Sequence, residues 1–137
     1  MRLATLAVCA LLASGHTVAS ADESSALQDV IGSQISSFRA KDHAAAFSHA
    51  APNIQLMFRN KEAFARMVRS GYMPIYGAQS FRFGRTKMQG NATAFQEVLL
   101  TGPRGRAWKA LYTLVRGKDG VWKIAGVRLL PGNEQTT

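Results

Sequence analysis

The chain has 137 residues, is 47% hydrophobic and is strongly basic, with 17 Lys and Arg against 8 Asp and Glu. That length gives one ordinary domain with a single hydrophobic core and is too short for two. The lone cysteine, Cys9, excludes an internal disulfide and a zinc site built on several thiolates.

The N-terminal segment has the layout of a secretory signal peptide. Arg2 is followed by an apolar run from Leu3 to Leu12, and the small residues Ala19 and Ala21 come just before Asp22. The run is about half of the ~20 apolar residues that a bilayer-spanning helix needs. A cleavable signal is therefore favoured over a membrane anchor or a buried helix.

Cleavage after Ala21 would leave residues 22–137 as one mature domain, with its core over about residues 25–131. We expect this domain to be exported to the periplasm, or secreted, in a Gram-negative bacterium, with no stable membrane span after processing. It would keep 16 basic against 8 acidic residues. Outside the cytosol, the expected partners of this positive charge are anionic envelope components rather than nucleic acid. The alternative is that the charge only keeps the protein soluble.

Three helices are predicted in the first half of this domain. Leu27, Ile31, Ile35 and Phe38 recur at helical spacing and form one apolar stripe. Ser25 is a plausible cap at the start of this first helix. The glycine within the helix, Gly32, indicates close packing against a neighbour.

The second and third helices are short and begin at polar caps. Asp42 is expected to cap a helix over His43–Ala50, which Pro52 ends. Asn60 is expected to cap the third helix, after a brief apolar segment. The buried face of that helix is predicted to be Ala63, Phe64, Met67 and Val68.

Four strands are predicted in the second half of the domain, where apolar residues no longer recur at helical spacing. The turn signals begin at Gly90, Gly102 and Gly117, and no helix separates them, so the strands form an antiparallel meander. The expected strands are Ser80–Met88, Ala92–Thr101, Arg106–Arg116 and Val121–Leu130. Several are apolar on both faces, so the sheet must curl around the helices or pair with another subunit.

The order of these elements resembles the nuclear-transport-factor-2-like superfamily. The resemblance is carried by the segment AKDHAAAF at residues 40–47 and by DGVWKI at residues 119–124. More narrowly, residues 58–83, with FARMV, YMPIY and SFRF, are similar to the bacterial exported family called domain of unknown function 4864.

This resemblance implies an α+β cone-shaped barrel, with about three N-terminal helices packed in a strongly curved antiparallel sheet. It also implies a pocket between helices and sheet and, in many members, a dimer through the outer sheet face. The superfamily includes enzymes and non-catalytic binding modules, so the fold does not decide the function. Its enzymes place titratable side chains inside the cone.

Glu97 is the one carboxylate within the predicted strands. It is either a buried general base or the partner of an arginine on an adjacent strand, namely Arg82, Arg116 or Arg128. The ion pair is favoured, because an unpartnered buried carboxylate is costly.

Asp42 and His43 are a second candidate for acid–base work. The alternative, which we favour, is that Asp42 caps the helix and His43 is a solvated first-turn residue. His43 and His49 do not share a helix face, so no metal site is expected. No cofactor is expected either.

Ligand-binding candidates are aromatic hydroxyl groups and arginines near the pocket. Tyr72 and Tyr76 flank a short connector between helix and sheet, and Tyr112 lies on a strand. The alternative for these rings is simple packing between layers. Arg82 and Arg128 complete the set.

The favoured hypothesis is a non-catalytic module that binds a small or anionic envelope ligand through the pocket or a basic surface. One alternative is a small acid–base enzyme that uses Glu97 or the Asp42/His43 pair. Another is a dimeric structural protein. The chain has no nucleophile elbow, phosphate loop or metal-ligand spacing, which favours binding over catalysis.

Overall fold

The computed structural model describes residues 20–132, which form an α+β fold. The helices in this part are α1 (Ala21–Arg39), α2 (His43–Ser48), α3 (Pro52–Phe58), α4 (Lys61–Gly71) and α5 (Met73–Tyr76). The strands are β1 (Ser80–Gln89), β2 (Thr93–Thr101), β3 (Ala107–Arg116) and β4 (Trp122–Pro131). None of the helices within residues 20–132 has the length and apolar character needed to cross a bilayer.

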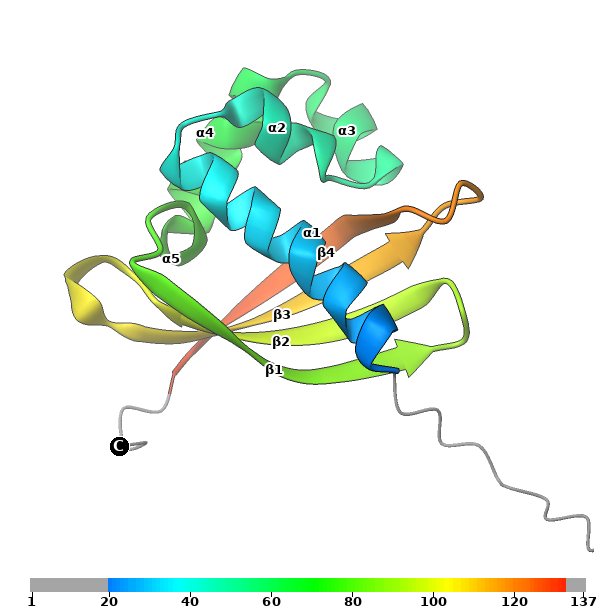
Figure 1. Cartoon of the computed structure of the whole chain (residues 1–137). Helices are drawn as coiled ribbons and strands as arrows, with labels where there is room; N and C mark the ends of the chain where they lie inside the picture. Colours follow the sequence, from blue (N-terminus) through cyan, green and yellow to red (C-terminus); the bar gives the residue numbers. More distant parts are fainter. Residues whose placement is uncertain (1–19, 133–137) are drawn as a thin grey trace, which may run out of the picture.

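The predicted antiparallel meander is confirmed. The strands pair in the order β1-β2-β3-β4, and each lies within a few residues of its expected bounds. The helices lie on one side of the sheet, whose strands bend toward α1 (Figure 1). Within residues 20–132 the sheet is open, because β1 and β4 do not pair to close a barrel.

Helix α1 buries the predicted stripe of Leu27, Ile31, Ile35 and Phe38. It begins earlier than expected, at Ala21, so Ser25 is not its cap. The cap is Ser20, whose hydroxyl oxygen accepts a hydrogen bond from the Glu23 N–H at 3.2 Å. The acidic first turn continues the helix toward its N-terminus, because negative charge is favourable at that end.

Two short helices were not predicted. The second helix was expected to reach Ala50 and to be ended by Pro52. It ends at Ser48 instead, and Pro52 begins α3, because the first turn of a helix does not use the missing proline N–H. The Gln55 amide fixes α3 by donating to the carbonyl oxygens of Phe47 and Ala50 at 3.2 and 3.0 Å. The expected connector before the sheet is the single turn of α5.

The two faces of the sheet differ in burial. On β2, Val98 and Leu100 are buried beneath the helices, whereas Phe95 points to the opposite face and is 37% exposed. On β3, Tyr112 is buried and Leu111 is 37% exposed. The core therefore lies between the helices and the inner face. No element within residues 20–132 covers the outer face (Figure 1).

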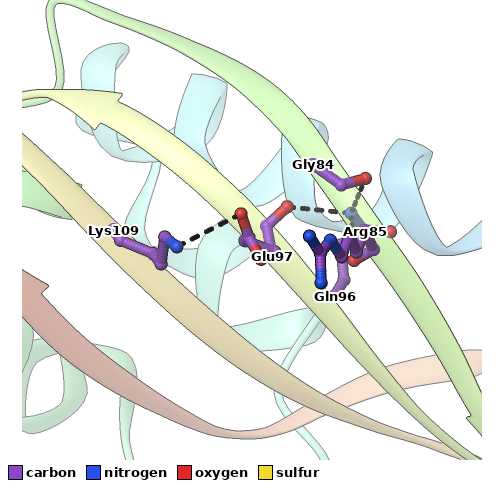
Figure 2. A network of polar contacts seen from close by, with 5 residues as sticks. All are labelled: Gly84, Arg85, Gln96, Glu97 and Lys109. Atoms are coloured by element: carbon purple, nitrogen blue, oxygen red, sulfur yellow. Dashed lines mark hydrogen bonds and ion pairs between the residues drawn. The ribbon is translucent and has the colours of Figure 1, made fainter. Parts of the chain in front are cut away.

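A buried amide supports an irregularity in β1. The register of β1 against β2 shifts between Phe83 and Thr86. The fully buried Gln96 amide donates to the carbonyl oxygens of Gly84 at 3.3 Å and Arg85 at 3.2 Å (Figure 2). Its own carbonyl oxygen accepts from the Thr86 hydroxyl. Gln96 thus satisfies backbone groups that the bulge removes from the ladder.

Candidate functional site

An apolar cavity of about 90 Å³ lies between the helices and β4. Its lining comprises Gln34, Phe38, Ala50, Ile54, Phe64, Met67, Val68, Tyr72, Ile75, Ile124, Gly126 and Val127. Only two of these residues have polar side chains, and none is charged. The cavity therefore suits an uncharged group that is mostly hydrocarbon.

Part of the helical wall of the cavity is formed by α4, whose buried face was predicted from the sequence. Phe64 and Val68 of α4 are buried, as predicted, whereas Ala63 and Met67 are only partly buried and Ala65 is buried instead. The rings of Phe38 and Phe64 lie 6.0 Å apart. The predicted cap of α4 is also confirmed, because the Asn60 side-chain oxygen accepts from the Ala63 N–H at 2.8 Å.

The connection between α2 and α3 attaches to the edge of β4 and closes the cavity on that side. Ala51 N–H donates to the Ile124 carbonyl oxygen, and Ile124 N–H donates to that of His49, both at 2.8 Å. These bonds satisfy backbone groups at an otherwise free sheet edge. They also bring Ala50 and Ile124 to the same wall of the cavity.

Gln34 is the polar group that the sequence did not single out. It is 4% exposed and lines the cavity, and its amide nitrogen donates to the Ala46 carbonyl oxygen at 3.1 Å. No residue of the described part donates to its Oε1 atom. The sequence feature that could have identified Gln34 is its position, three residues after Ile31 and therefore on the apolar stripe of α1.

The three tyrosines occupy different places. Tyr72 lines the cavity. The Tyr76 hydroxyl instead lies 3.1 Å from Nε2 of His43 and is not part of the lining. Tyr112 is fully buried, its hydroxyl has no partner among the described residues, and burial raises its pKa far above the usual value.

Asp42 caps α2, the interpretation that the sequence favoured. Its Oδ1 atom accepts a hydrogen bond from the Ala45 N–H at 3.1 Å. His43 is partly buried beside Tyr76, with the two ring centroids 6.0 Å apart. Neither Asp42 nor His43 lines the cavity. The sequence missed the His43–Tyr76 contact because 33 positions separate the two residues.

Glu97 lies on the outer face of the sheet, away from the cavity (Figure 2). Its carboxylate is 3.5 Å from the Lys109 ammonium, and its side chain is 22% exposed. The favoured ion pair exists, but its partner is a lysine rather than an arginine. Lys109 pairs with Leu99 in the register, which places it diagonally across β2 and β3 from Glu97.

The arginines considered with Glu97 are also outside the cavity. Arg82 and Arg128 lie on the outer face, opposite Leu99 and Leu111 in the register. The Arg116 guanidinium lies 5.2 Å from the centroid of the Trp122 ring. Within residues 20–132, no group of three His, Cys, Asp or Glu side chains is arranged to hold a metal ion.

The family model described as Domain of unknown function (DUF4864) matches residues 20–137. The chain belongs to this family. The match covers all of the described helices and strands, so the DUF4864 region includes the whole cavity and both faces of the sheet. No curated protein matches the chain.

Proposed function

We propose that this DUF4864 protein is a non-catalytic module that binds a small apolar ligand in the cavity between the helices and β4. The observation that carries the proposal is the composition of the lining, which has ten apolar residues and two uncharged polar ones. Concave apolar sites with a few polar groups are the usual form of small-molecule sites. Gln34 and Tyr72 supply those polar groups.

The volume of the cavity limits the size of the ligand. An apolar cavity of roughly 150 Å³ binds benzene, and the cavity of about 90 Å³ is smaller. A short alkyl chain, or the end of a longer one, fits this space. The Oε1 atom of Gln34 is placed to accept a hydrogen bond from a hydroxyl on such a ligand, because no described residue donates to it.

The cavity chemistry supports binding over catalysis. Acid–base enzymes need a titratable group within reach of the substrate, and no carboxylate or imidazole lines this cavity. Glu97 is paired with Lys109 on the other side of the sheet. The Asp42 carboxylate is engaged as a helix cap.

We also propose that the chain is an exported member of the nuclear-transport-factor-2-like superfamily. The order of helices followed by a meander, with a cavity between the two layers, supports the superfamily assignment. The signal-like pattern ending at Ala21 supports export. Residues 1–19, including Ala19 of that pattern, lie outside the described residues.

Binding of n-alcohols from propanol to hexanol, measured by titration calorimetry, tests the proposed function. We expect saturable one-to-one binding that strengthens with chain length and then weakens when the chain outgrows the cavity. Val68→Phe fills the cavity and should abolish binding, and Val68→Leu should reduce it.

The matched control is Val121→Phe, the same change at an exposed position outside the cavity lining. It should bind the alcohols as the wild type does. Undiminished binding by Val68→Phe, folded as judged by circular dichroism, would place the alcohols elsewhere and contradict the proposal.

A further inference from the structure

The outer face of the sheet has a composition unlike that of an ordinary solvated surface. Its apolar side chains are Phe95, Leu99, Leu111, Val115 and Leu130. Its basic side chains are Arg82, Lys87, Lys109 and Arg128. Lys123 holds an outer-face position in the register, but its ammonium turns to α2. Glu97 is its single carboxylate. No described element covers this face, so it presents apolar area and positive charge together.

The two kinds of side chain are separated in space. Most of the apolar residues lie on the central strands β2 and β3, and three of the four cations lie on the edge strands β1 and β4. The register places Leu99 beside Arg82, and Leu111 beside Arg128. We call the large apolar side chains of β2 and β3 the apolar band; the Glu97–Lys109 ion pair and threonines interrupt it, and cations on the edge strands flank it on each side.

Much of the charge on this margin is uncompensated. Lys109 is paired with Glu97, and the Lys123 ammonium donates to the Ser48 carbonyl oxygen at 2.6 Å. Arg82, Lys87 and Arg128 make no ion pair or hydrogen bond with other residues in the described part of the chain. Three cationic groups are thus available to an anionic partner at the rim of the apolar band.

We propose that the outer face docks on an anionic phospholipid bilayer. The strands bend toward the helices, so the outer face is convex and open (Figure 1). Phe95 and Leu111, each 37% exposed, would contact the boundary between headgroups and acyl chains. The flanking arginines and Lys87 would reach the lipid phosphates.

Charge argues against a second copy of this chain as the occupant. Two outer faces brought together would oppose the same cationic margins, because Arg82, Lys87 and Arg128 of each face have no anionic partner in the described part of the chain. Like charges in an interface disfavour association. An anionic surface satisfies the same cations and covers the same apolar band. The inference is independent of the cavity, which lies on the other side of the sheet.

Flotation with lipid vesicles tests the inference, using the protein as isolated from its own cells. We expect binding to vesicles that contain phosphatidylglycerol, weaker binding as salt is raised, and little binding to phosphatidylcholine alone. Arg82→Gln with Arg128→Gln should weaken binding about 10- to 30-fold. Phe95→Ser with Leu111→Ser should also weaken it, because the apolar contact is lost.

Matched pairs on the helical side serve as controls. Arg66→Gln with Arg69→Gln removes two exposed charges from α4, and Leu56→Ser with Met57→Ser removes the most exposed large apolar side chains. Leu56 and Met57 are 77% and 68% exposed, so this pair is a stringent control for nonspecific hydrophobic binding. Both control pairs should bind as the wild type does.

Three results would overturn the inference. One is the absence of binding to the phosphatidylglycerol vesicles at low salt. Another is an equal loss in the control and outer-face arginine pairs, which would show binding by net charge alone. The third is a dimer in sedimentation velocity that Leu111→Ser dissociates, which would assign the face to a second copy. Binding of n-alcohols, measured without vesicles, separates these outcomes from failure of the proposed function.

Discussion

Two buried glutamines show how single residues have different roles in similar surroundings. Gln96 uses its amide to satisfy the carbonyl groups of a β-bulge, so its role is structural. Gln34 uses its amide nitrogen for one carbonyl group, and its oxygen has no donor among the described residues. Buried polar groups are normally paired. Among the described residues, the Tyr112 hydroxyl is the one fully buried side-chain N or O atom without a partner, so the Gln34 oxygen keeps some contact with solvent or with a ligand.

His49 provides a prediction of pH dependence. Burial lowers its pKa below the usual 6.5, and the positive charge of Lys123 lowers it further. The unfolded chain takes up this proton near pH 6.5, before the folded chain does. The contribution to stability is therefore intact above about pH 6.5 and is lost as the pH falls below it.

We expect the free energy of unfolding to fall from about pH 7 to pH 5, and His49→Gln to reduce that fall. Urea denaturation of both proteins across this range measures the difference. Equal slopes in the two proteins would show that His49 does not carry the effect.

At the scale of elements, α1 organises the fold, because its buried stripe faces the inner side of the sheet. The helix crosses β1 at Gly32, where the nearest atoms to an added Cβ would be in the rings of Phe81 and Phe83. Gly32 faces a neighbouring element, as the sequence indicated, but the packing there is not close enough to require a glycine. The distance to Phe81 would still be 3.8 Å, an ordinary contact rather than a clash.

Gly32→Ala should therefore stabilise the protein by about 0.5–1 kcal/mol, because alanine lowers the entropy of the unfolded chain and favours the helix. Thermal and urea unfolding measure the change. Gly71→Ala, at the end of α4 with no atom near the added Cβ, is the control and should give a smaller gain. A loss of stability in Gly32→Ala would mean that the Phe81 ring cannot accept the methyl group.

At the scale of the whole molecule, the open sheet has two edges with different protection. The β4 edge is covered near Ile124 by the connection between α2 and α3. The β1 edge carries a bulge and the exposed cations Arg82, Arg85 and Lys87. Bulges and charges both oppose pairing with another strand. These features keep the open sheet from extending edge to edge.

If the protein is exported, its N-terminal segment should be removed. We expect the protein isolated from the envelope fraction to begin at Asp22, which intact-mass measurement detects. Removal of Ser20 deletes the cap of α1, so the processed protein should be about 1 kcal/mol less stable than a chain that begins at Ser20. A mass that includes the first 21 residues would contradict the predicted cleavage.

Local patterns in the sequence determined much of the fold. The stripe of α1, the caps at Asp42 and Asn60 and the four strands follow from periodicity and side-chain chemistry over a few residues. Helix α3 was missed because the apolar segment before Asn60 is too brief for a clear helical period, and α5 was missed because it is a single turn of four residues.

Only the tertiary structure decided the site. On β2 both faces carry apolar residues, so alternation alone cannot tell which face the helices cover. Helix packing settled that choice, and it turned Glu97 outward to Lys109. The same packing enclosed Gln34 in the apolar cavity. The sequence by itself determined which segments are helix and strand, because those preferences are local; the positions of the polar groups depend on contacts between distant segments.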